Sequence, residues 1–154
     1  MPWVTHIILC YTFFTCARAV VVGQDIIVNI TANGLVKGEN ITNSLDDSHY
    51  YAFHAIPYAE PPLGELRFKP PKPYSQIWNG TYDASDPYKE KICPQLEDYN
   101  YIHVSTYDEN CLHLSVYTPQ YSLSKDDAKF PVLVWIHGGS FEHGTGMYQY
   151  HGPE

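Results

Sequence analysis

Residues 131–146 read Pro-Val-Leu-Val-Trp-Ile-His-Gly-Gly-Ser-Phe-Glu-His-Gly-Thr-Gly, and this stretch decides the fold class. Residues 132–136 form an unbroken run of apolar side chains, most of them β-branched or aromatic, which is typical of a strand buried on both faces. The run breaks abruptly at Gly138 and Gly139. The pattern predicts a central strand of a parallel sheet over residues 132–136, followed by a sharp turn.

The two glycines also suggest a type of chemistry. Because Gly138 and Gly139 carry no side chains, their backbone N–H groups can approach a ligand closely. In acyl transfer the carbonyl oxygen becomes negative in the transition state, and one fixed donor facing it can lower the barrier by about 3–4 kcal/mol. The stretch therefore indicates ester chemistry.

The length of 154 residues and an apolar content of 44% allow one domain with a core and exclude a disordered chain. Near the N-terminus, residues 7–16 are apolar and are followed by Ala17-Arg18-Ala19, a pattern cut by signal peptidase. We expect residues 1–19 to be a signal peptide and residues 20–154 to be the mature chain. A membrane anchor is the alternative, but about ten apolar residues are fewer than the roughly 20 that a bilayer requires.

Cysteines and glycan acceptors agree with a secreted, extracellular protein. Cleavage would leave Cys93 and Cys111, which we expect to pair in an oxidising compartment and to stabilise the fold by about 3 kcal/mol. Two free buried thiols are the alternative. The acceptor triplets for N-linked glycans start at Asn29, Asn40 and Asn79.

Charge argues against a nucleic-acid partner. Without Arg18 the mature chain has 8 basic and 17 acidic residues, a net charge of −9 with histidine neutral. Binding to a phosphate backbone needs a basic stripe, whereas the basic residues here are scattered singly among acids. The acidity indicates solubility and says nothing of the charge of a substrate.

Other segments predict strands but few helices. Asn33-Gly34 separates two strand-like runs and predicts a tight antiparallel hairpin. Residues 50–56 and the alternating residues 112–117 are further predicted strands. No convincing amphipathic helix is present, although a parallel sheet needs crossover helices on its faces. We therefore expect the chain to be the front part of a longer protein.

Three motifs occur in this order along the chain: Phe53 to Phe68 (FHAIPYAEPPLGELRF), Glu109 to Pro119 (ENCLHLSVYTP) and Val134 to Phe141 (VWIHGGSF). In order and spacing they resemble the type-B carboxylesterases, the carboxylesterase and cholinesterase family of α/β-hydrolases. The resemblance runs from about Asp25 to the end. It implies an α/β class: the N-terminal portion of an α/β-hydrolase, with an antiparallel hairpin leading into a mixed, mostly parallel central sheet that is incomplete here.

The resemblance implies a serine carboxylic-ester hydrolase whose nucleophile lies in Gly-x-Ser-x-Gly and is followed by an acid and a histidine. None of this triad is present, so we expect the chain to be inactive alone. By motif position, the N–H groups of Gly139 and Ser140 are the implied oxyanion donors, and Gly138 shapes the turn. Ser140 is therefore expected to act through its N–H and not through its hydroxyl.

Three histidines lie close to the glycine turn: His137, His143 and His151. The catalytic histidine of the family lies far downstream, so we expect structural or surface roles for these three. Their spacing lacks the acid or cysteine set of a zinc site. We expect neither a metal nor a cofactor.

The resemblance also implies a partly buried salt bridge between Arg67 and Glu109, which would fix geometry more than it stabilises. Two unrelated surface charges are the alternative. The chain departs from the usual family residues at positions that affect local hydrogen bonds. Ala55 replaces Gly, and Asn110, His113 and Ser115 replace Asp, Tyr and Asn.

The loop between the cysteines bears on the substrate. Cholinesterases hold a quaternary ammonium through a tryptophan in the loop closed by the first disulfide. Here that loop contains Tyr99, Tyr101 and Tyr107 but no tryptophan. We therefore expect a small, neutral or hydrophobic carboxylic ester, not a choline ester.

Two other functions compete with the esterase. A cholinesterase-like adhesion ectodomain would have kept the fold and lost the chemistry, and the intact Gly138-Gly139 turn favours the enzyme over it. A small independent binding protein is the third possibility. It is disfavoured because residues 132–136 would then expose a large apolar patch.

Overall fold

The computed structural model describes residues 26–30, 32–95, 107–119 and 129–153. The expected signal peptide, residues 1–19, lies outside the described residues, as do Tyr99 and Tyr101. The chain forms strands β1 (Ile26–Ile30), β2 (Gly34–Thr42), β3 (His49–Pro57), β4 (Thr81–Asp83) and β5 (His113–Thr118), short 3-10 helices at Gly64–Leu66 and Pro87–Lys89, and helix α1 (Tyr148–His151).

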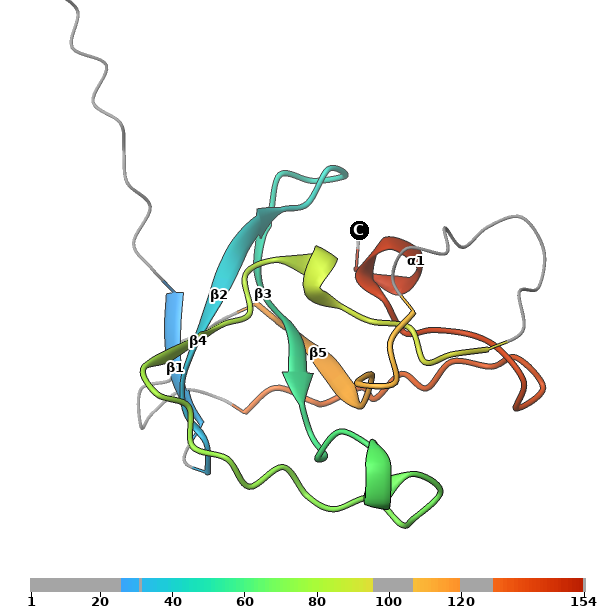
Figure 1. Ribbon diagram of the computed structural model, residues 1–154. Coiled ribbons are helices and arrows are strands. Elements are labelled where there is room, and N and C mark those ends of the chain that lie inside the picture. The colour runs from blue at the N-terminus through green and yellow to red at the C-terminus, as the bar shows by residue number, and fades with distance from the viewer. Residues whose placement is uncertain (1–25, 31, 96–106, 120–128, 154) are drawn as a thin grey trace, which may run out of the picture.

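These strands form one sheet in the order β1-β2-β3-β5, with β4 beside β2 (Figure 1). The β1–β2, β2–β3 and β3–β5 pairs are antiparallel, and the β2–β4 pair is parallel. The regular secondary structure of the described residues is therefore mainly strand, with little helix. In this part of the chain, no helix is long and apolar enough to cross a bilayer.

The predicted hairpin around Asn33-Gly34 is confirmed. In the β1–β2 register Ile30 faces Gly34, and Gly34 has φ of 117°. Glycine suits this position because a side chain is strained at positive φ. The Asn33 side chain then donates to the Gln76 carbonyl at 3.0 Å, so the turn also holds the chain that leads into β4.

The hydrophobic core lies on one face of the sheet and is small. Ile26, Val36, Phe53 and Ala84 are buried together. Half-buried side chains surround them, among which the Trp78 and Tyr82 rings stack with centroids 4.7 Å apart. The predicted strands at residues 50–56 and 112–117 are confirmed as β3 and β5. Strand β3 adds Phe53 to the core, with Tyr51 and Ile56 packed against it.

The prediction of a buried central strand at residues 132–136 is not confirmed by the described residues. The segment pairs with none of the described strands, and its side chains are 63–93% exposed. A strand of this composition needs a hydrogen-bonded neighbour and cover on both faces. The described sheet instead ends at β5 and contains a single parallel pair, so a mostly parallel sheet does not form among these residues.

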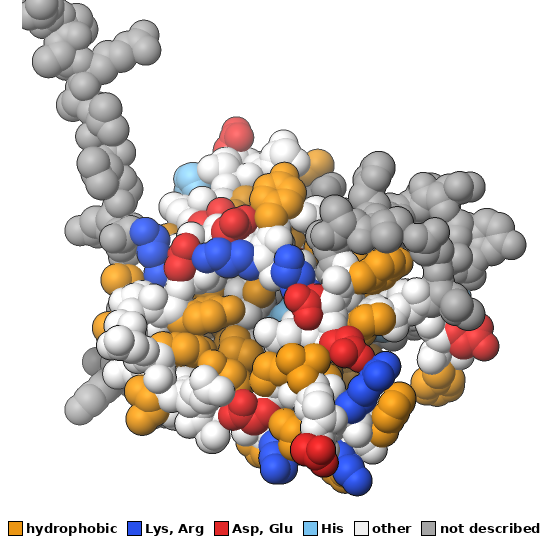
Figure 2. All heavy atoms as spheres, viewed as in Figure 1, with side chains coloured by type: hydrophobic (Ala, Val, Ile, Leu, Met, Phe, Trp, Pro, Cys, Tyr) orange, Lys and Arg blue, Asp and Glu red, His pale blue; other side chains and the backbone are white. Residues whose placement is uncertain are grey.

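Charge on the surface is mixed. Figure 2 shows Lys and Arg side chains interspersed with Asp and Glu on the face turned to the viewer, with hydrophobic side chains between them. A surface of this kind produces local fields of both signs instead of one extended potential.

Candidate oxyanion loop

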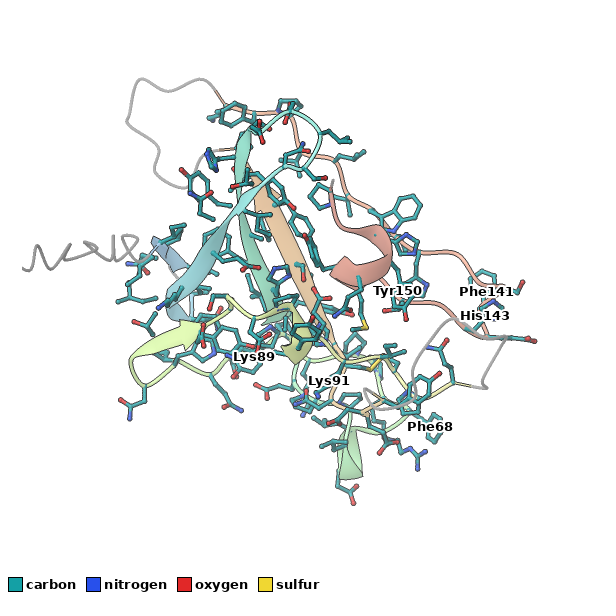
Figure 3. The ribbon with its side chains drawn as sticks, turned by 90° about the horizontal axis from the view of Figure 1, so that it is seen from above. Phe68, Lys89, Lys91, Phe141, His143 and Tyr150 are labelled. Carbon is teal, nitrogen blue, oxygen red and sulfur yellow. A yellow bond between two sulfur atoms is a disulfide. The ribbon has the colours of Figure 1, made fainter. Side chains whose placement is uncertain are left out.

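The chain turns sharply after residue 136. Gly139, Ser140 and Phe141 follow one another at φ of 125°, 57° and 63°, in the left-handed region. The N–H groups of Glu142 and His143 both donate to the Gly139 carbonyl, at 3.0 and 3.1 Å. Phe141 and His143 lie at the tip of a loop that projects away from the sheet (Figure 3). We call residues 137–144 the glycine loop.

The N–H groups proposed as donors make no internal hydrogen bonds in the part of the chain that the structure describes. Neither the Gly139 nor the Ser140 N–H donates to a described residue, and Ser140 is exposed. An N–H that is not used within the fold can donate to a ligand oxygen. The geometry therefore permits an oxyanion contact at these two groups.

Glycine is required at two positions of this loop. A Cβ on Gly139 would overlap the backbone of His143, with the carbonyl carbon 2.7 Å away. A Cβ on Gly144, which has φ of 120°, would overlap the Gly138 carbonyl oxygen and the His137 ring. At Gly138 the space is open. Sequence reasoning singled out Gly138 and missed Gly144. Glycine is required at position 144 because the closed loop brings Gly138 and His137 against it.

The three histidines near the turn do not converge. His137 Nδ1 lies 2.8 Å from the Gly138 carbonyl oxygen, so its contact is local. The His151 ring packs 5.4 Å from the Trp135 ring, and His143 is at the loop tip (Figure 3). Among the described residues no group of His, Cys, Asp and Glu has the geometry to hold a metal.

Sequence reasoning missed a buried polar network that joins the sheet to α1. His54 is fully buried, with Nε2 2.9 Å from Glu39 Oε1 and Nδ1 3.2 Å from Glu90 Oε1. Ser115 Oγ also donates to Glu90, and the Tyr148 N–H donates to Glu90 Oε2 at 2.7 Å. The network joins β2, β3, β5 and α1. Its signal in the sequence is His54, which lies between apolar residues in the middle of a predicted strand.

The network favours the charged forms of its buried members. Burial lowers the pKa of His54, but hydrogen bonds and charge from Glu90 and Glu39 outweigh burial and raise that pKa above 6.5. Burial raises the pKa of Glu90, but hydrogen bonds from His54, Ser115 and the Tyr148 N–H bring it below 4.5. His54 and Glu90 therefore act as an ion pair.

Stability should depend on pH through this pair. The contribution of His54 is present in full below its unfolded pKa of 6.5 and is lost as pH rises through the raised folded pKa. The contribution of Glu90 is present above 4.5 and is lost as pH falls through its lowered folded pKa. We expect the pair to contribute most between those two values.

Urea unfolding between pH 4 and pH 9 checks this expectation on the parent chain and on His54→Gln. Burial lowers the pKa of His113, so the titration of His113 changes stability with pH in the opposite direction to that of His54. The contribution of His54 is therefore the difference in stability between the parent chain and His54→Gln at each pH. An identical alkaline slope in both proteins would contradict the assignment.

The departures from the usual family residues make local contacts. Ala55 has φ of 55°, a left-handed conformation that glycine adopts more easily, at the irregularity between Phe53 and Ile56 in the β3–β5 register. Ser115 Oγ accepts from the Ala55 N–H at 3.4 Å in addition to donating to Glu90. His113 Nε2 accepts from the Lys91 N–H at 2.8 Å.

Cys93 and Cys111 form a disulfide, with Cα atoms 5.1 Å apart. Nearby, Arg67 Nε lies 3.0 Å from Glu109 Oε1, and the two side chains are 58% and 42% exposed. The ion pair is therefore more exposed than the partly buried pair that the family resemblance implied. A pair this open to solvent is worth at most about 1 kcal/mol.

Removing the disulfide should cost more than removing the ion pair. We expect replacement of both cysteines by serine to lower the free energy of unfolding by about 3 kcal/mol. Arg67→Ala should lower it by less than about 1 kcal/mol. Urea unfolding of the two variants under non-reducing conditions gives the comparison, and equal losses would contradict it.

The remaining predicted residues and a cavity lie elsewhere. Asn29 on β1, Asn40 on β2 and Asn79 before β4 are all exposed. A cavity of about 270 Å³ opens at the proline-rich segment, where Tyr58, Leu66 and Leu112 are among its lining residues. No residue of the glycine loop lines it.

Comparison with known proteins agrees with these observations. The sequence matches the carboxylesterase family over residues 24–154. The chain therefore belongs to the carboxylesterase family.

Its relatives include several fruit-fly esterases. The chain is 38% identical over 149 residues to Esterase-5A of Drosophila pseudoobscura pseudoobscura, covering 96% of this chain and 25% of that protein. It is 33% identical to Esterase-5C of the same fly, covering 94% and 25%, and 35% identical to Esterase P of Drosophila melanogaster, covering 94% and 24%. The chain spans about a quarter of the length of these curated relatives.

Proposed function

We propose that this chain is the N-terminal part of a secreted serine carboxylic-ester hydrolase and supplies its oxyanion donors. The observation that carries the proposal is the left-handed turn at Gly139 and Ser140, whose N–H groups donate to no described residue. Membership of the carboxylesterase family supports it. Catalysis then depends on a serine, an acid and a histidine supplied by sequence that this chain does not contain.

The exposed apolar run at residues 132–136 fits this proposal. Its side chains are those of a strand covered on both faces, yet they are exposed here. In the complete α/β-hydrolase sheet this run becomes a central parallel strand, and neighbouring strands and helices from downstream sequence cover it. The turn after it then faces the reacting carbonyl.

Secretion is part of the same proposal. Residues 1–19 act as the signal peptide, and the family match begins at residue 24, after the expected cleavage point. The disulfide and the exposed positions of Asn29, Asn40 and Asn79 support passage through the secretory pathway. Endoglycosidase treatment of the secreted chain, followed by mass measurement, tests it.

The substrate is a small hydrophobic or neutral carboxylic ester. Residues 94–110 contain no tryptophan that could bind a quaternary ammonium. The full-length protein should therefore hydrolyse neutral aryl or alkyl esters faster than choline esters. Relative kcat/KM values for a matched pair of such esters decide between the two classes.

The chain alone should show no turnover. Oxyanion donors without nucleophile and base retain little activity, because these groups act as a unit. Assay of the purified chain with an aryl ester and a serine-reactive phosphonate checks this, and phosphonate-sensitive hydrolysis would contradict it. Sequencing of the coding region beyond codon 154 completes the test. A Gly-x-Ser-x-Gly there supports the esterase, and its absence from an otherwise complete domain favours the adhesion ectodomain.

A further inference from the structure

Within the described residues, the Gln95 side chain holds the glycine loop through paired hydrogen bonds to Gly144. Gln95 Oε1 accepts from the Gly144 N–H at 2.6 Å, and Gln95 Nε2 donates to the Gly144 carbonyl oxygen at 3.0 Å. Nε2 also donates to the Cys93 carbonyl oxygen at 3.1 Å. The amide thus uses its oxygen and both of its N–H bonds, which fixes its orientation.

The fastened residue lies against the proposed donors. Gly144 approaches the Gly138 carbonyl so closely that a Cβ would overlap its oxygen. The Gly139 carbonyl closes the turn by accepting from Glu142 and His143. A displacement of Gly144 therefore moves Gly138 and Gly139 with it.

The other side of the contact is tied to the fold by a disulfide. Gln95 follows Cys93, whose disulfide to Cys111 ties it to the start of β5. Beyond Gly144, Thr145 and Met147 are buried, and the Tyr148 N–H is held by Glu90. Gly144 is thus held between the disulfide on one side and the buried network on the other.

We propose that Gln95 is a positioning residue for the oxyanion donors, acting through Gly144. The inference rests on the proposed function, because it assigns Gln95 a part in the same site. Catalytic effects of this kind depend on distance, and displacement of a group by about 1 Å can cost 100-fold in rate. A loop that projects from the sheet, as Figure 3 shows, needs a support of this type to hold its N–H groups in place.

The first experiment measures the contact itself and needs no activity. Amide hydrogen exchange is followed in the 154-residue chain, in Gln95→Ala and in Gln95→Glu. We expect the Gly144 amide to be protected in the parent chain and to exchange about tenfold faster in Gln95→Ala, since the paired hydrogen bonds are lost. Gln95→Glu keeps the acceptor and loses both donors, so its exchange should be intermediate.

Gln76→Ala is the matched control. The Gln76 amide donates to Glu60 Oε2 at 3.2 Å and is distant in sequence from the loop, so its removal should leave Gly144 exchange unchanged. A parent Gly144 amide that exchanges as fast as an unprotected amide overturns the proposal without any variant. Equal exchange in the parent and Gln95→Ala overturns it as well.

The second experiment measures positioning in a complete enzyme, made by joining this chain in register to the downstream part of a Drosophila relative. Gln95→Ala should lower kcat about 10- to 100-fold with KM nearly unchanged. Gln95→Glu should recover part of the loss, and Gln76→Ala should have no effect. Faster exchange at Gly144 with unchanged kcat would make Gln95 merely structural and overturn the inference. A parent fusion without esterase activity would count against the proposed function, while the exchange result would still decide whether Gln95 holds the loop.

Discussion

His54→Ala should lower the free energy of unfolding by about 3–5 kcal/mol, because it leaves a buried carboxylate without its partner. Glu90 is 1% exposed and is held by His54, Ser115 and the Tyr148 N–H. The substitution removes the positive charge beside Glu90. The buried carboxylate must then take up a proton or be solvated by water that enters the site. Urea unfolding near pH 6, where both members of the pair are charged, measures the effect.

His49→Ala is the control for that measurement. His49 begins the same strand but is exposed, and its contact with Thr42 Oγ1 is 3.3 Å long. Its replacement should change stability by no more than about 0.5 kcal/mol. If the two histidine variants lose similar amounts, the buried network contributes no more than a surface contact and our account of it is wrong.

Gly139→Ala should lower kcat of the complete enzyme by about 10²–10³-fold, the cost of losing one oxyanion donor. The added Cβ overlaps the His143 backbone, and alanine is strained at φ of 125°. The turn must open to accommodate it, which moves the Gly139 and Ser140 N–H groups. KM should change little, because the contact is made mainly in the transition state.

Gly146→Ala, two residues beyond the glycine loop, is the matched control. Nothing lies within 4 Å of its added Cβ, and Gly146 does not have positive φ. It should retain the parent kcat. Equal losses in Gly139→Ala and Gly146→Ala would show that the loss of kcat does not depend on oxyanion geometry. The affinity of a trifluoromethyl ketone inhibitor should fall in parallel with kcat only for Gly139→Ala.

Local patterns predicted much of the sheet. Asn33-Gly34 predicted the hairpin because the turn type and its register are decided by adjacent residues. The alternation of apolar and polar residues that predicted β5 is likewise a property of a single strand. The disulfide was predicted from the small number of cysteines and the expected compartment, both of which are visible in sequence.

Features that depend on distant segments were not predicted. The partners of His54 come from β2, from the segment after the second 3-10 helix and, through Ser115, from β5, so no local spacing reveals them. Gln95 and Gly144 are 49 positions apart. The prediction for residues 132–136 differs from the structure for another reason. The composition of this run suits a strand covered on both faces, and the described residues do not cover it.

Strand β2 has a consequence for how changes in length would be tolerated. Its first half pairs with β1 and β4, and its second half pairs with β3. Gly38 lies where the halves meet, and there the Phe53 ring occupies the space of a side chain. A one-residue deletion in β2 would therefore invert the inward and outward alternation towards several neighbours at once, and no single compensating substitution could restore it.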